Sequence, residues 1–186
     1  MENINSTQQF SPEAYKYCPN ITAGWKHGLH TLGFNQRELE KRILDVGCGY
    51  EGSTLLEALS IYGVDPNLGL LRVRGDGIVR ATPKPAVPER SIRALAEQLP
   101  FLDESFDFAY STKAVGWYPN HINLEMALSE MLRVIKKKTG IVIFNWGQDM
   151  KPEIINPVLQ HYHRAGFSVM PKGEWIYVTH PEFNPE

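Results

Sequence analysis

The sequence contains few of the features that mark several large protein classes. Its 186 residues include only two cysteines, Cys18 and Cys48, so a disulfide-rich scaffold is excluded and both thiols are expected to be reduced. No apolar run approaches the ~20 residues needed to cross a bilayer. The polar stretch from Met1 to Gln9 also lacks the apolar core of a secretory signal. We therefore expect a cytoplasmic protein with no membrane partner.

A strong charge of either sign is also absent. The formal net charge is -2, which gives no overall attraction to nucleic acid, so nucleic acid is not an expected partner. Neither a Cys-x-x-Cys pair nor a His-Glu-x-x-His motif occurs, so no metal site is predicted. The hydrophobic share of 42% and the charged share of 22% are ordinary for a globular domain, and the length favours one such domain.

The most informative segment begins at Ile43, where a short apolar run ends in Asp45, Gly47, Cys48 and Gly49. This pattern is typical of a buried strand that opens into a ligand-binding turn. Glycine suits such a turn because it adopts positive φ without steric cost and lets the backbone approach a ligand. A second apolar run ends in Asp65, where a carboxylate is well placed to accept hydrogen bonds from ribose hydroxyls.

The pattern of apolar residues alternates between strand and helix from Arg42 onward, which predicts a parallel sheet. Expected strands end at Val46 and Val64 and cover about 91–95, 106–111, 140–145, 167–170 and 175–179. Expected helices cover about 53–60, 68–73, 124–135 and 152–165. Residues 1–41 are expected to form a capping segment with patchy helical spacing, and residues 42–186 the cofactor-binding domain.

Further segments give a resemblance to a known family. Ala96-Glu97-Gln98-Leu99-Pro100-Phe101 and the following Asp103, Ser105, Phe106 and Asp107 closely resemble a signature of class I S-adenosylmethionine (SAM)-dependent methyltransferases. The run from Glu130 to Lys136 resembles that family's helix end, and the run from Gly140 to Phe144 its fifth strand. The resemblance implies a three-layer Rossmann-like α/β fold, with a mostly parallel seven-stranded sheet and an antiparallel C-terminal strand.

The resemblance also implies SAM as the cofactor and a set of contacts to it. The implied cofactor-binding residues are Asp45, Gly47, Cys48, Gly49, Asp65, Pro66, Ala96, Glu97 and Ser111. Two positions depart from the family pattern. The third glycine is Gly52 instead of residue 51, and Leu95 stands where the family commonly has an acid that accepts a hydrogen bond from adenine. Leucine cannot accept that bond, so the main-chain amide of Ala96 is expected to recognise adenine.

The implied activity is methyl transfer to an acceptor that the sequence does not identify. A small molecule is favoured over a macromolecule because the charge is balanced. His121 is the candidate general base, needed only for an oxygen nucleophile. Two other functions stay open: a catalytically silent SAM-fold binding or partner protein, and a nicotinamide-dependent reductase suggested by the G-x-G-x-x-G pattern from Gly47 to Gly52. No pattern indicates the oligomeric state.

Overall fold

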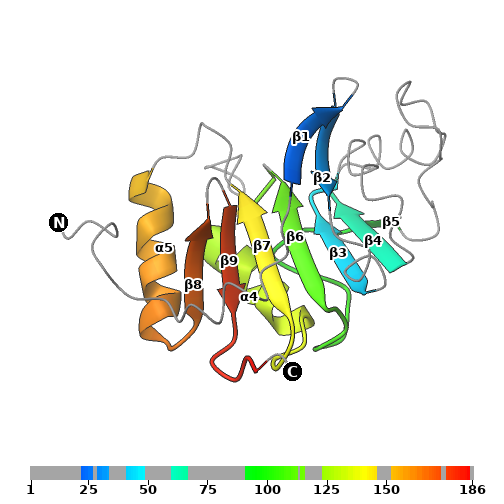
Figure 1. The fold of residues 1–186 in the computed structure, drawn as a ribbon. Helices are drawn as coiled ribbons and strands as arrows, with labels where there is room; N and C mark the ends of the chain where they lie inside the picture. The colour runs from blue at the N-terminus through cyan, green and yellow to red at the C-terminus, as the bar shows by residue number, and fades with distance from the viewer. Residues whose placement is uncertain are drawn as a thin grey trace.

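The computed structural model of this protein describes residues 22–26, 29–33, 41–48, 60–66, 91–112, 114–115, 123–145, 152–172 and 175–184. Two sheets are present in this part of the chain (Figure 1). The smaller is an antiparallel pair, β1 (Thr22–Lys26) and β2 (Leu29–Gly33). The helical spacing expected for the capping segment is therefore wrong over these residues, because the chain reverses between them and pairs with itself. The proposed division at residue 41 stays a prediction.

The larger sheet has seven strands in the order β5-β4-β3-β6-β7-β9-β8. The strands are β3 (Arg42–Val46), β4 (Ser60–Asp65), β5 (Ser91–Arg93), β6 (Phe108–Thr112), β7 (Ile141–Asn145), β8 (Ser168–Lys172) and β9 (Trp175–Thr179). Strand β9 runs in the direction opposite to the other six strands of this sheet. The fold class expected from the sequence is thereby confirmed. The strand order reverses between β3 and β6, which is where open α/β sheets bind their ligands.

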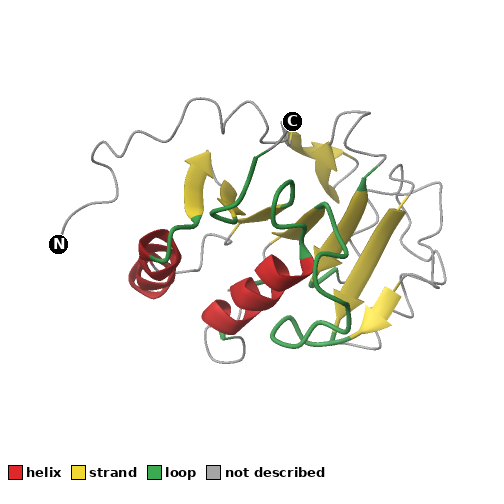
Figure 2. Ribbon diagram, turned by 90° about the horizontal axis from the view of Figure 1, so that it is seen from below, coloured by secondary structure: helices red, strands yellow, loops and turns green. Residues whose placement is uncertain are grey.

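The two described helices, α4 (Leu124–Val134) and α5 (Pro152–Arg164), lie on one side of this sheet (Figure 2). Helix α4 buries a stripe of apolar side chains at helical spacing: Leu124, Ala127, Leu128, Met131, Leu132 and Val134. They pack in one cluster with Val46, Ala109 and Phe144 of the sheet. Each fully buried Leu or Met contributes roughly 1.5–3 kcal/mol, so this face fixes α4 firmly against β6 and β7.

The opposite face of the sheet carries a second apolar cluster, which includes Ile43, Phe108, Tyr110, Ile143 and Tyr177. Side chains alternate between faces along a strand, so residues two positions further along lie on the same side. Asp45, Thr112 and Asn145 therefore share the face of this second cluster. This alternation determines which polar groups gather at the sheet's carboxyl edge.

The end of α5 follows its sequence signal closely. Gly166 has φ of +92°, the left-handed conformation that terminates many helices. Its N–H donates to His163 O at 3.0 Å, and the Phe167 N–H donates to Tyr162 O at 3.0 Å. The rings of Tyr162 and Phe167 then stack edge to face, 5.3 Å between centroids. The expected stop at Gly166 is confirmed. The expected helix at 68–73 lies outside the described residues, as does the one at about 53–60 except for its last residue, Ser60, which begins β4.

Candidate functional site

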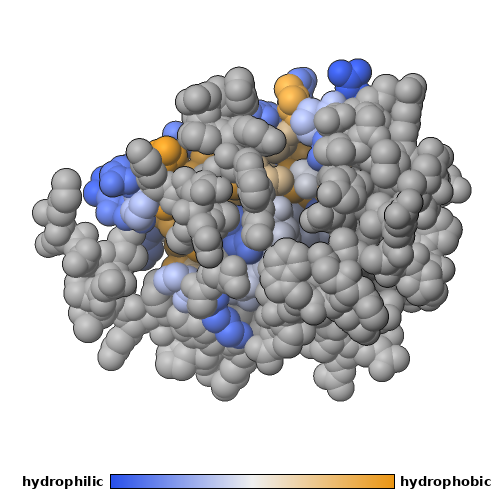
Figure 3. Space-filling view, turned by 90° about the horizontal axis from the view of Figure 1, so that it is seen from above, coloured by the Kyte–Doolittle hydropathy of each residue, from blue (hydrophilic) through white to orange (hydrophobic). Residues whose placement is uncertain are grey.

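Four polar side chains close neighbouring strands at the carboxyl edge of the large sheet. Asp45, Asp65 and Asn145 are 2%, 7% and 1% exposed, and the hydroxyl oxygen of Thr112 is likewise buried. We call these four residues the edge row. Register places them on one face: Asp45 aligns with Gly63, two positions before Asp65, and Thr112 aligns with Asn145. Figure 3 views the molecule from this edge, with hydrophilic and hydrophobic described atoms side by side.

The edge row has a charged half and a neutral half. The two carboxylates end β3 and β4, whereas the hydroxyl and the amide end β6 and β7. The Thr112 hydroxyl has no hydrogen-bond partner within the part of the chain that the structure describes. A buried hydroxyl without a partner carries a desolvation cost of about 1–3 kcal/mol, which a bound polar group would remove.

The turn after β3 strongly favours glycine at position 47. Gly47 has φ of +74°, and a Cβ added there would lie 2.0 Å from the Cβ of Ala114, which follows β6. The N–H groups of Gly47 and Cys48 both donate to Val64 O, at 2.8 and 3.0 Å. The start of the turn is therefore joined to the end of β4, and these two amides are hydrogen-bonded within the protein.

The segment from Leu95 to Gln98, which holds Ala96, is a tight turn after β5. The Gln98 N–H donates to Leu95 O at 3.2 Å, so β5 ends earlier than the expected residue 95. The Leu95 side chain is 54% exposed and does not belong to the core beneath the strand. Ala96 is half-buried against the core cluster. Leu95 thus lies on the surface directly before the predicted adenine contact.

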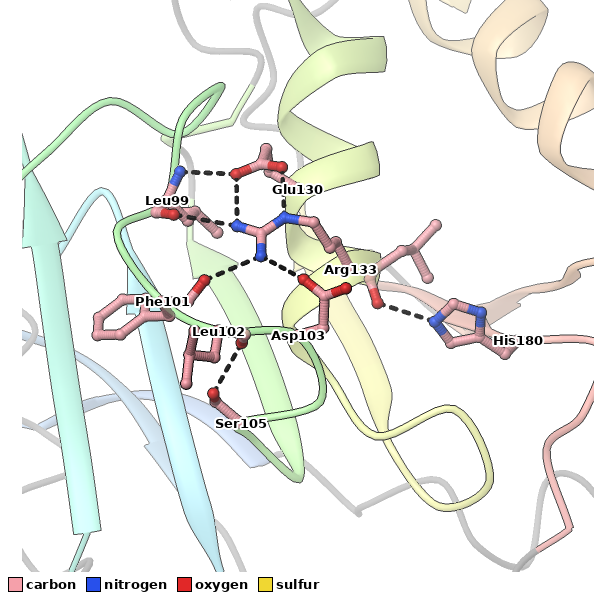
Figure 4. Close-up of polar contacts among 9 residues, drawn as sticks. Leu99, Phe101, Leu102, Asp103, Ser105, Glu130, Arg133 and His180 are labelled. Atoms are coloured by element: carbon pink, nitrogen blue, oxygen red, sulfur yellow. Dashed lines mark hydrogen bonds and ion pairs between the residues drawn. The ribbon is translucent and has the colours of Figure 1, made fainter.

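The next residues are held by α4 through one arginine (Figure 4). The guanidinium of Arg133 donates to the main-chain oxygens of Leu99 and Phe101, to Asp103, and twice to Glu130, at distances from 2.7 to 3.0 Å. These bonds use all five N–H donors of the side chain. Glu130 also accepts the Leu99 N–H at 2.8 Å. We call these five residues the Arg133 clamp.

The hydrogen bonds of the clamp shift the pKa values of Glu130 and Arg133. The hydrogen bond from Arg133 lowers the pKa of the Glu130 carboxyl below its ordinary value of 4.5, and burial opposes this only partly. The bonds to Glu130 and Asp103 in turn raise the pKa of Arg133, so that its charge is permanent. The clamp is therefore an ion pair at neutral pH, and it fixes the loop after Ala96 on α4.

A second carboxylate secures the base of the same loop. Asp107 accepts the Arg42 N–H at 2.9 Å and the Lys136 ammonium at 2.8 Å. The Arg42 guanidinium lies over the rings of Tyr62 and Phe106, at 5.5 and 5.4 Å from their centroids. Asp107, the last residue of the recognised signature, thus joins the start of β3 to the residues after α4. Its role is structural.

Several predicted site residues have protein partners in this structure. Ser111 is fully buried and accepts the Val115 N–H at 3.0 Å, so its hydroxyl holds the turn after β6. Pro66 is exposed, and its carbonyl accepts a bond from Arg93 at 3.1 Å. Glu97 accepts the Asn123 N–H at 3.1 Å. Their role as cofactor contacts stays a prediction, as it does for Asp45, Cys48, Asp65 and Ala96.

Gly49 and His121 lie outside the described residues, as does Gly52. The sequence interpretation missed Thr112 and Asn145. Both could have been found from the signal that identified Asp45 and Asp65, since each is a polar residue closing an apolar strand. No group of three or more metal-ligating side chains occurs among the residues described. The helices of this part of the chain are all too short or too polar to span a membrane.

The charged half of the edge row fits a nucleoside-bearing cofactor. Buried carboxylates suit ribose hydroxyls, because a charged acceptor binds such donors strongly. The Gly47 turn brings main chain against β4 and β6 at the point where strand order reverses. The chemistry of these groups thus agrees with the cofactor that the sequence resemblance implied.

Comparisons with known proteins point the same way. A family model for the methyltransferase domain matches residues 44–144, which is more than half of the chain. The chain is 31% identical over 116 residues to a protein of Encephalitozoon cuniculi assigned as a methyltransferase, covering 60% of this chain and 48% of that protein. It is 38% identical over 104 residues to an uncharacterized protein of Methanocaldococcus jannaschii, covering 55% and 35%. The chain spans about half or less of the length of these curated relatives.

The fold is shared with solved structures at low sequence identity. A Methanococcus maripaludis protein, assigned as a SAM-dependent methyltransferase, matches with a TM-score of 0.58 and 14% identity. The match covers 79% of this chain and 80% of that one. At this level of identity the likeness concerns the fold alone.

Proposed function

Because the chain belongs to the methyltransferase domain family, whose cofactor is SAM, we propose that it transfers the SAM methyl group to a small-molecule acceptor. The observation that carries this proposal is the division of the edge row. In it, the carboxylates of Asp45 and Asp65 serve the cofactor, and the Thr112 hydroxyl, which has no hydrogen-bond partner among the described residues, serves the acceptor. The two halves meet between β3 and β6, where strand order reverses.

SAM would supply a methyl group on a sulfonium: the acceptor's nucleophile would bond the methyl carbon in line as the carbon–sulfur bond breaks and the neutral thioether S-adenosylhomocysteine leaves, so alignment of nucleophile and methyl group would provide much of the catalysis. Asp65 accepts hydrogen bonds from the ribose hydroxyls, and the Ala96 amide recognises adenine. The Thr112 hydroxyl donates to, or accepts from, a polar group of the acceptor. His121 takes a proton if the nucleophile is an oxygen, and it has no necessary role if the nucleophile is a nitrogen.

Dinucleotide binding is the less favoured alternative. In that mode the glycine turn would offer its N–H groups to a pyrophosphate. Here the N–H groups of Gly47 and Cys48 both donate to Val64 O. The balanced net charge supports a small acceptor over a nucleic acid, and the cytoplasm remains the proposed place of action.

A calorimetric titration with SAM and with NAD tests the cofactor. We expect SAM to bind and NAD not to bind. Asp65→Ala should weaken SAM binding by ten- to hundredfold, since hydrogen bonds to a charged group contribute about 1.5–3 kcal/mol. Glu153→Ala, on the exposed first turn of α5, is the control and should leave affinity unchanged. An unchanged dissociation constant in a folded Asp65→Ala protein would exclude the ribose role.

Incubation of a cell extract with the protein and methyl-labelled SAM tests the acceptor class. Label in the small-molecule fraction supports the proposal, and label in the protein or nucleic-acid fraction contradicts it. SAM binding without label in any fraction would favour the catalytically silent binding protein.

A further inference from the structure

The N-terminus of α4 is capped by two residues that lie far apart in the sequence. Asn123 is the N-cap, and its side-chain oxygen accepts the Met126 N–H at 3.1 Å. In the usual capping box, a Glu or Gln at the position of Met126 would return a bond to the N–H of the N-cap residue. Methionine cannot do so. Instead the carboxylate of Glu97, 26 residues earlier, accepts the Asn123 N–H at 3.1 Å.

Glu97 directly follows Ala96, the predicted adenine contact, in the turn closed by the bond between Gln98 and Leu95. Two residues later the Arg133 clamp holds Leu99 on the far end of the same helix. The segment is therefore attached to α4 at both ends of the helix. Asn123, for its part, follows the predicted base His121 by two positions. One hydrogen bond thus joins the cofactor segment to the residue at which the chain enters α4.

We propose that Glu97 is a positioning residue that couples the predicted cofactor segment to the N-terminus of α4 through the Asn123 N–H. This inference rests on the proposed function, because it takes Ala96 as a cofactor contact. The bond holds Ala96 in its binding position before the cofactor arrives. Less conformational entropy is therefore lost on binding. By thermodynamic reciprocity, a bound cofactor also stabilises the start of α4.

The test measures SAM affinity and hydrogen exchange in the wild type and in five variants of the full chain. Glu97→Ala removes the acceptor and should raise the SAM dissociation constant about three- to tenfold, as expected for one hydrogen bond. Glu97→Gln keeps a side-chain oxygen of the same reach and should change it by about twofold or less. In the wild type, SAM should slow hydrogen exchange of the Met126 and Ala127 amides, and Glu97→Ala should abolish this slowing.

The partner variants isolate the N–H donor. Asn123 has φ of -75°, which proline adopts readily, so Asn123→Pro removes the N–H while keeping the backbone angle. Asn123→Ala loses the same capping side chain but keeps the N–H, and it is the matched control. We expect Asn123→Pro to weaken SAM binding as much as Glu97→Ala, and Asn123→Ala to weaken it clearly less. The double variant Glu97→Ala with Asn123→Pro should be no weaker than either single variant.

Two results would overturn the coupling while leaving the proposed function intact. The first is a loss of affinity in Glu97→Ala with no loss in Asn123→Pro, which would mean that Glu97 contacts SAM directly. The second is strictly additive losses in the double variant, which would mean that the two residues act independently. A wild-type chain that does not bind SAM overturns the proposed function, and the coupling with it.

Discussion

The Arg133 clamp and the edge row contain similar residue types but use them in opposite ways. In the clamp, every N–H donor of the partly exposed Arg133 is paired. The donors bind oxygens of the loop from Leu99 to Asp103 and the carboxylate of Glu130 on the same helix. In the edge row, polar groups are more deeply buried, and the Thr112 hydroxyl has no hydrogen-bond partner within the described residues. A saturated network holds structure, whereas a buried hydroxyl that lacks a partner is available to a ligand. The part of the recognised signature from Leu99 to Asp103 is therefore held by structural hydrogen bonds, whereas the strand ends are the groups that we propose for ligand binding.

The largest expected effect comes from removing the centre of the clamp. Arg133→Ala removes the donor to the carbonyls of Leu99 and Phe101 and to Asp103, and it leaves the Glu130 carboxylate with the Leu99 N–H. We expect a loss of about 3 kcal/mol, because several hydrogen bonds to a charged group are lost, each worth about 1.5–3 kcal/mol, and the partial exposure of the ion pairs offsets part of that sum. For a chain of this length that corresponds to a fall in melting temperature of about 6–12 °C.

Two further arginine variants sharpen this prediction. Arg133→Lys keeps the charge but has three donors, so it should lie between wild type and Arg133→Ala. Arg164→Ala, at the exposed end of α5, is the matched control and should melt like wild type. If Arg133→Ala and Arg164→Ala had the same melting temperature, the clamp would not stabilise the fold. The contrast between a structural clamp and a ligand-binding edge row would then be wrong.

The second prediction concerns the turn between the two halves of the edge row. Gly47→Ala combines a strained positive φ with a Cβ placed 2.0 Å from that of Ala114. We expect destabilisation of about 2 kcal/mol, typical of overpacking, together with a loss of SAM binding. Thermal melting and SAM titration measure both.

Relieving the contact separates the two causes. The double variant Gly47→Ala with Ala114→Gly removes the clash and leaves only the backbone strain, so it should recover part of the stability. Full recovery of stability would show that the positive φ at residue 47 adds no strain to an alanine. No recovery would show that the contact with Ala114 does not cause the destabilisation.

The third prediction uses pH to remove the clamp without mutation. The folded-state pKa of Glu130 is lowered, so its stabilising contribution is complete above the ordinary value of 4.5 and is lost as pH falls through the folded value. Glu130→Gln should therefore be less stable than wild type at pH 7, and this difference should shrink as pH falls below about 4.5.

Urea unfolding at a series of pH values measures that difference in the free energy of unfolding. Glu182→Gln, whose side chain is exposed near the C-terminus, serves as the control and should show no such convergence. A constant gap between wild type and Glu130→Gln from pH 7 to pH 3 would contradict the assignment of the shift to Arg133.

The fold was largely predictable because its core strands and α4 have clear apolar periodicity. The hairpin from Thr22 to Gly33 was not, since its short strands include Gly24, His30 and Thr31 and show no strict alternation. The positions of Asp45 and Asp65 at or near strand ends were predictable from local pattern, and their cofactor roles stay predictions. The hydrogen bonds that Glu97 and Asp107 accept were not predictable, because each partner is distant in sequence and only the tertiary structure brings it near.

The smallest expected effect tests the departure of Leu95 from the family pattern. Because this side chain is 54% exposed, a charge placed there stays solvated and should leave melting unchanged. If Ala96 contacts adenine, Leu95→Asp supplies an acceptor beside the exocyclic amine and should tighten SAM binding severalfold, since one hydrogen bond contributes about 0.5–1.5 kcal/mol. Leu95→Asn, which offers an uncharged acceptor, should give a smaller gain, and Leu102→Asp, on the more exposed leucine of the clamped loop, should give none. Equal affinities for Leu95→Asp and wild type would place adenine away from this turn, and the cofactor would then be held mainly by the charged half of the edge row.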